Sequence, residues 1–166
     1  MITTEQIWNT LYLSKYKSYL SDLLVVKYQK YDRGINLFLA ICSSSSIAAW
    51  AVWDEFSFFW SIIIVASQVI TVLKPYFPHN KYYTEYNKRS VEFSLISTEL
   101  EILFRQLATA ETDIKRIRTI EFDFNNLLRR LNKADEMGTD VIILVSEEMR
   151  NAAEQSTIEY LSNYTI

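Results

Sequence analysis

Two apolar segments decide the fold that the sequence predicts: residues 34–53 (GINLFLAICSSSSIAAWAVW) and residues 56–73 (FSFFWSIIIVASQVITVL). Neither segment contains a charged residue or a histidine, and only Asp54 and Glu55 separate them. As a helix, each segment would be roughly 27–30 Å long, which matches the hydrocarbon thickness of a bilayer. Because the link is so short, we expect the two helices to form an antiparallel transmembrane hairpin. The alternative is a pair of helices buried in a soluble core, for which the remaining sequence offers little apolar surface.

The flanking sequences predict the orientation of this hairpin. Basic residues precede the first segment and follow the second, whereas the link holds only two acidic residues. The positive-inside rule then places both termini in the cytoplasm. Aromatic residues near the link and after the second segment are expected to anchor the hairpin at the membrane interfaces; they are Trp50, Trp53, Trp60, Tyr76 and Phe77.

The composition favours long helices. The 166 residues include only two glycines and two prolines, and the formal net charge is −3. We therefore expect an all-α membrane protein with no direct nucleic-acid binding. The single Cys42 lies in the first apolar segment, so an internal disulfide is excluded.

The N-terminal region, residues 1–33, predicts an amphipathic helix. Thr3 and Gln6 have the spacing of a capping box at its start. Tyrosines and lysines alternate along it, which suits either a helix lying at the membrane surface or one packing on the later helices. Both interpretations remain open, and Gly34 marks a place where the helix is expected to bend.

Residues 74–166 predict a cytoplasmic helical region. A helix over residues 81–108, a break at 108–113 and a second helix over 112–137 form an expected antiparallel hairpin. A third helix is expected within 140–162, with Ser146 as its cap. Apolar residues at steps of three and four form a coiled-coil-like row that we call the helical seam, interpreted as a helix-packing or oligomer contact; it comprises Phe93, Ile96, Leu100, Leu103, Leu107, Ile117, Phe124, Leu127 and Leu131.

Each apolar segment also carries polar residues on one face, and we call these residues the polar seam. Two interpretations of this seam are possible. Its residues form hydrogen bonds that hold the transmembrane helices together, or they line a pore in an oligomer. The sequence leaves both interpretations open. The polar seam comprises Asn36, Ser43 and Ser46 in the first segment, and Ser57, Ser61, Gln68 and Thr71 in the second.

The sequence offers little material for enzymatic chemistry. It contains no phosphate-binding glycine-rich loop and no metal-ligand spacing, and its lone His79 lies beside no second ligand or nucleophile. Arg150 is followed five residues later by Gln155, where a helical ribonuclease motif of the HEPN type requires histidine. We therefore expect no catalytic site, no metal and no cofactor.

The layout resembles the SLATT family of bacterial two-transmembrane defence effectors. The resemblance covers residues 5–136 and includes the stretches TELEILFRQL and FNNLLRRLNKADE. It implies a protein of the bacterial inner membrane that oligomerises and permeabilises the membrane, causing growth arrest or death. It also implies a defence-system sensor protein or a nucleotide signal as the trigger. The outline is similar, too, to the membrane pore protein that accompanies type VI-B CRISPR systems.

The leading hypothesis from the sequence is therefore an oligomeric, pore-forming membrane effector. One alternative is a membrane-anchored helical module that recruits a cytosolic partner without forming a pore. Another is a holin-like lysis protein, to which the long region after the hairpin is poorly suited.

Overall fold

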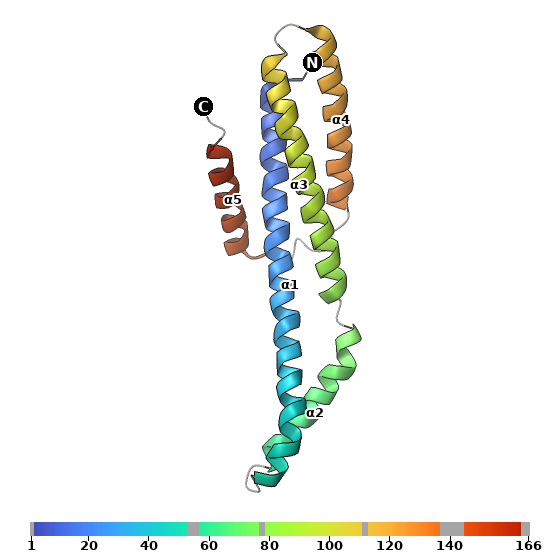
Figure 1. Cartoon of the computed structure of the whole chain (residues 1–166), viewed down its shortest axis with the longest axis vertical. Helices are drawn as coiled ribbons and strands as arrows, with labels where there is room; N and C mark the ends of the chain where they lie inside the picture. Colours follow the sequence, from blue (N-terminus) through green and yellow to red (C-terminus); the bar gives the residue numbers. More distant parts are fainter. Residues whose placement is uncertain (1, 53–56, 77–78, 111–112, 137–144, 164–166) are drawn as a thin grey trace. The chain divides into compact units, whose positions relative to one another are not determined.

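The computed structural model describes residues 2–52, 57–76, 79–110, 113–136 and 145–163; within these ranges, the side chains of residues 44–52, 57, 60 and 79–81 are not described. All regular structure in these ranges is helical, so the predicted all-α class is confirmed. The helices are α1 (Thr4–Val52), α2 (Ser57–Leu73), the short 3₁₀ helix η2 (Lys74–Tyr76), α3 (His79–Thr109), α4 (Ile114–Glu136) and α5 (Glu147–Ser162). They form two compact units (Figure 1), one of residues 1–25 and 84–166 and the other of residues 26–83.

Helix α1 is continuous over 49 residues, where the sequence predicted two helices with a bend at Gly34. A helical glycine costs only about 1 kcal/mol relative to alanine, which a long helix with good neighbours absorbs. The predicted capping box at the start of α1 is present. The Gln6 amide donates to Thr3 Oγ1 at 3.2 Å, and the Thr3 amide donates to Gln6 Oε1 at 3.1 Å.

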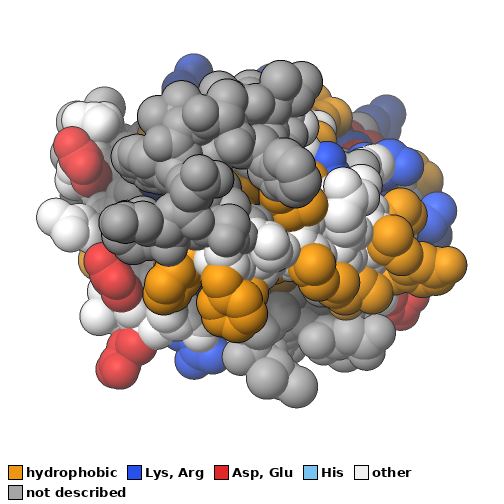
Figure 2. Space-filling view, turned by 90° about the horizontal axis from the view of Figure 1, so that it is seen from below, with side chains coloured by type: hydrophobic (Ala, Val, Ile, Leu, Met, Phe, Trp, Pro, Cys, Tyr) orange, Lys and Arg blue, Asp and Glu red, His pale blue; other side chains and the backbone are white. Residues whose placement is uncertain are grey.

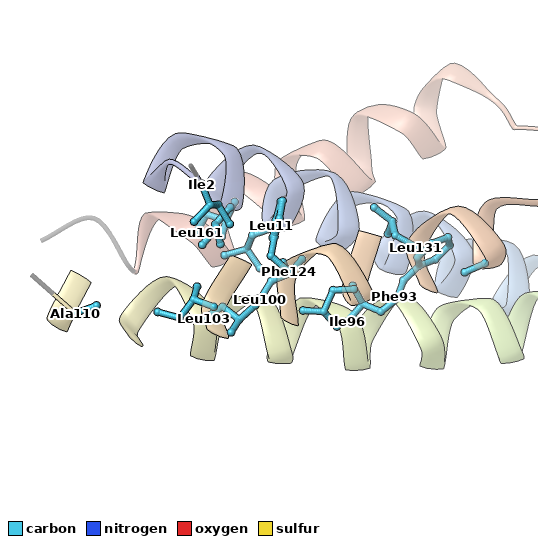
Figure 3. Close-up of a cluster of buried hydrophobic side chains, with 14 residues drawn as sticks. Ile2, Leu11, Phe93, Ile96, Leu100, Leu103, Ala110, Phe124, Leu131 and Leu161 are labelled. Atoms are coloured by element: carbon cyan, nitrogen blue, oxygen red, sulfur yellow. The ribbon is translucent and has the colours of Figure 1, made fainter. Parts of the chain in front are cut away.

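The helical seam forms the core of the first unit. There α3 and α4 run antiparallel beside the N-terminal half of α1, and the core also includes Leu161 of α5 (Figures 1 and 3). Phe93, Ile96 and Leu100 are completely buried, whereas Leu107 and Ile117 are half-buried at the core's edge. The seam thus joins helices of one chain, so a contact between copies needs a different surface.

Small polar residues let α1 approach α3 closely. Ser14 Oγ donates to the carbonyl oxygen of Phe93 at 3.0 Å, and Ser18 Oγ donates to that of Ser90 at 3.3 Å. Ser14, Ser18 and Ser21 are all buried. A serine fills little space and satisfies its hydroxyl on the neighbouring backbone, so it suits a tight helix contact.

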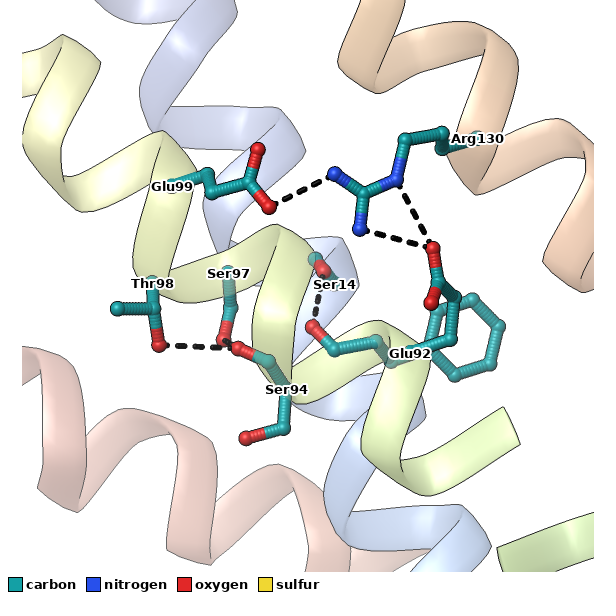
Figure 4. Close-up of polar contacts among 8 residues, drawn as sticks. Ser14, Glu92, Ser94, Ser97, Thr98, Glu99 and Arg130 are labelled. Carbon is teal, nitrogen blue, oxygen red and sulfur yellow. Dashed lines mark hydrogen bonds and ion pairs between the residues drawn. The ribbon is translucent and has the colours of Figure 1, made fainter. Parts of the chain in front are cut away.

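Arg130 of α4 links this helix to α3 through two carboxylates (Figure 4). Its guanidinium donates to Glu99 at 2.7 Å and to Glu92 at 2.9 Å. These hydrogen bonds raise the pKa of Arg130, with Glu99 contributing most, so its charge is constant in any practical buffer. The other basic residues of α4 are exposed, as expected for a solvated face; they are Lys115, Arg116, Arg118, Arg129 and Lys133.

Helix α5 begins at the predicted cap. Ser146 has an extended backbone conformation, and its Oγ accepts from the Met149 amide at 3.4 Å. The predicted helical start near residue 140 lies outside the described residues. Arg150 and Gln155 are both exposed on this helix.

Candidate functional site

The second unit, residues 26–83, contains most of the predicted hairpin. The less exposed positions of α1 in this unit recur at steps of three and four: Ile35, Leu39 and Cys42 continue the row begun by Tyr28. On α2 they are Ile63, Ile64, Ser67 and Ile70. This periodicity identifies the two faces through which the legs of the hairpin pack on each other.

The two legs also expose many large apolar side chains. The exposed side chains include Phe58 at 72%, Val65 at 63% and Val72 at 66%. Figure 2 shows hydrophobic side chains gathered on the face that it presents. A broad exposed apolar surface is typical of contact with lipid or with another protein. On the two legs the large exposed apolar side chains are Leu37, Phe38, Ile41, Phe58, Phe59, Ile62, Val65, Val69, Val72 and Leu73.

Within the described part of the chain, no helix combines the length and the apolarity that a bilayer span requires. Helix α2 has 17 residues where the sequence predicted a span over 56–73. The span predicted over 34–53 extends into residues whose side chains the structure does not describe, and residues 53–56 lie outside the described ranges.

The described members of the polar seam are not buried between the legs of the hairpin. Ser61, Gln68 and Thr71 are exposed on α2, as are Asn36 and Ser43 on α1. Two of their hydroxyls return to their own helices: Thr71 Oγ1 donates to the Ser67 carbonyl at 2.8 Å, and Ser43 Oγ donates to the Ala40 carbonyl at 3.0 Å. The side chains of Ser46 and Ser57 are not described.

Among the described side chains of the two legs, Ser67 is the buried polar residue, and it is not one of the predicted seam residues. Its side chain is 8% exposed and its Oγ donates to the Ile64 carbonyl at 2.8 Å. Its place between Ile63 and Ile70, at steps of four and three, was the available signal. On α2, Ser61, Gln68 and Thr71 therefore lie on the exposed surface of the unit, as does Ser43 on α1.

Asn36 bridges the two legs at the base of the hairpin. Its side-chain oxygen accepts a hydrogen bond from Lys74 Nζ, and its amide nitrogen donates to Asp32 Oδ2 at 2.8 Å. Asn36 thus holds together a cation on one leg and an anion on the other.

Tyrosines pack beside this base. The rings of Tyr28 and Tyr82 lie 5.7 Å apart between centroids, and Gln29 Nε2 donates to the Tyr83 hydroxyl at 3.3 Å. Burial, with smaller contributions from Tyr82 and Tyr31, raises the pKa of Tyr28 above 10.0. Among the predicted interface anchors, Tyr76 is 81% exposed. The side chains of Trp50 and Trp60 are not described, and Trp53 and Phe77 lie outside the described residues.

The first unit offers a shallow groove of about 360 Å³ between α3 and α4. Its polar lining includes Glu99 and Arg130, which pair with each other, together with Asp123, Asn126 and Gln106. Among the described residues, no group of three histidine, cysteine or acidic side chains is arranged to bind a metal.

Comparisons with protein-family models, curated proteins and solved structures found no match to this chain. Function is therefore inferred from the hairpin's surface and from the helices that carry it.

Proposed function

We propose that this protein is an oligomeric membrane effector whose hairpin inserts into the bacterial inner membrane and depolarises it, causing growth arrest or death. The observation that carries the proposal is the exposed polar stripe of Ser61 and Gln68 on α2, set among exposed apolar side chains. The resemblance to the SLATT family supports antiviral defence as its setting. Both termini lie in the cytoplasm in this proposal.

Gln68 of this stripe needs a polar partner if lipid surrounds the hairpin. Among the described residues, the Gln68 amide has no hydrogen-bond partner, and Gln68 lies near the middle of α2. An unsatisfied amide in hydrocarbon is costly, so a bilayer favours arrangements in which it meets water or another chain. A ring of hairpins with this stripe turned inward supplies both and creates an aqueous path.

The test is membrane depolarisation after induced expression, measured with a potential-sensitive dye. We expect the double substitution Ser61→Leu with Gln68→Leu to abolish depolarisation, because it makes the stripe apolar. A matched control, Ile62→Leu with Val69→Leu, changes two exposed positions on another face of α2 and should retain activity. Equal amounts of each variant in the membrane fraction must be verified. Undiminished depolarisation by the stripe variant would show that this face does not line the path.

An interaction module tethered by the hairpin is a second candidate function. It is favoured by Val91, Leu95 and Ile102 of α3, which are each about half exposed and recur at steps of four and seven. Such a row on a helix suits docking of another helix. Replacing the hairpin with an unrelated membrane hairpin should preserve the activity of a tethered module, whereas a pore former should lose it.

A further inference from the structure

We infer that the outer face of α1 in the second unit binds anionic phospholipid, and this inference rests on the proposed insertion of the hairpin. The face is defined by residues at steps of four, three, four and four, all of them exposed: Val26, Lys30, Arg33, Leu37 and Ile41. It lies on the side of the helix opposite the packed row of Tyr28, Ile35, Leu39 and Cys42.

This face changes from cationic to apolar within about one helical turn. Arg33 and Leu37 are four residues apart, so their side chains are neighbours on the helix surface. From Lys30 to Ile41 the helix rises about 16 Å at ~1.5 Å per residue, enough to contact a headgroup and the upper part of its acyl chain. Lys30 and Arg33 thus face the lipid phosphate, while Leu37 and Ile41 lie along the acyl chain of the lipid.

The charges at the base favour an anionic headgroup over a zwitterionic one. Among the described residues, neither Lys30 nor Arg33 has an ion-pair partner. The nearest acidic residue in sequence, Asp32, is half-buried and accepts a hydrogen bond from Asn36. The outer face therefore carries two exposed positive charges, and long basic side chains reach headgroups readily from a helix at the membrane surface.

Lipid selectivity can be measured on the full-length protein reconstituted in phosphatidylcholine vesicles. A trace of spin-labelled phosphatidylglycerol or spin-labelled phosphatidylcholine reports the fraction of lipid held motionally restricted by the protein. We expect a larger restricted fraction for phosphatidylglycerol, and the preference should weaken as salt is added. In the double variant Lys30→Gln with Arg33→Gln, the preference should fall by up to about fivefold for each charge removed.

Two further variants separate this site from general charge effects and from damage to the fold. Lys115→Gln with Arg116→Gln removes two exposed charges from α4 and should leave the preference unchanged. Lys30→Arg with Arg33→Lys keeps both charges and should retain the preference.

Either of two results would overturn the inference while leaving membrane insertion intact: an equal preference in wild type and the Lys30/Arg33 double variant, or an equal loss in the α4 control. Absence of restricted lipid of either kind would instead overturn the proposed insertion itself.

Discussion

Ser14 and Phe93 join α1 to α3 at a point where both side chains are completely buried. The Ser14 hydroxyl donates to the Phe93 carbonyl oxygen at 3.0 Å, so the two helix backbones come close together. The short side chain is therefore as important as the hydrogen bond.

The first prediction distinguishes these two contributions. Ser14→Ala should lower the free energy of unfolding by only about 1 kcal/mol, because it removes a hydrogen bond and keeps the small volume. Ser14→Leu should cost about 1–3 kcal/mol or more, because it forces the helices apart. Chemical denaturation of the purified full chain measures both. Ser94→Leu, at an exposed position of α3, is the control and should be nearly neutral. Equal effects of the two Ser14 variants would contradict the close-packing argument.

The second prediction concerns Phe93 itself. Phe93→Ala should destabilise the first unit by about 3–5 kcal/mol, since it empties a buried position. The ring also lies 5.8 Å from Lys17 Nζ and 5.7 Å from the Arg89 guanidinium carbon, so its loss removes two cation contacts. Thermal unfolding monitored by circular dichroism provides the measurement. Phe122→Ala on α4 is the matched control, because Phe122 is 65% exposed and should contribute little.

The third prediction tests the bridge from Arg130 to Glu92 and Glu99. Arg130→Gln should destabilise the α3–α4 pair by about 0.2–1 kcal/mol, because the bridge is partly exposed and screened by solvent. The difference from wild type should shrink at high salt. Arg129→Gln changes the neighbouring exposed arginine and should have no comparable salt-dependent effect. A difference for Arg130→Gln that is independent of salt would contradict an electrostatic origin.

The fourth prediction is a loss of stability at alkaline pH. Burial raises the pKa of Tyr12 and of Tyr19 above 10.0, and nearby carboxylates, Glu154 for Tyr12 and Asp22 for Tyr19, raise it further. A raised folded-state pKa means that the stabilisation is complete below the unfolded-state value of about 10 and is lost as pH rises through the folded-state value.

Tyrosinate absorbance and unfolding experiments across this range measure that loss. Tyr19→Phe should reduce the alkaline decrease in stability, because phenylalanine cannot ionise. A decrease of the same size in the variant would show that Tyr19 does not contribute to it.

Local sequence patterns were sufficient for the helices of the first unit. The Thr3–Gln6 pair, the Ser146 cap and the helical seam each depend on residues three or four apart, and all three are present in the structure. Helix α1 continues through Gly34 without a break, because one glycine does not outweigh the surrounding turns of a 49-residue helix.

Contacts between residues that are distant in the sequence could not be predicted from such local patterns. The partners of Arg130, at Glu92 and Glu99, are more than thirty positions away, and no periodicity selects them from the other acidic residues of α3. A row of three buried serines on α1 gave no clear signal either: Ser14, Ser18 and Ser21. In the sequence they form a polar repeat at steps of four and three, and such a repeat is equally typical of a solvent-exposed helix face.

The sequence by itself determined that the chain is helical, where most helices begin and end, and which apolar residues form the core of the first unit, because these follow from backbone capping and helical periodicity. Only the tertiary structure decided which polar residues the legs of the hairpin bury. Ser67 packs between the legs, while Ser61 and Gln68 face outward. The physical reason is that helical periodicity shows which polar residues share one face of a helix, but not what that face contacts. The contact is decided only when the rotation of the helix about its axis, relative to its neighbour, is fixed.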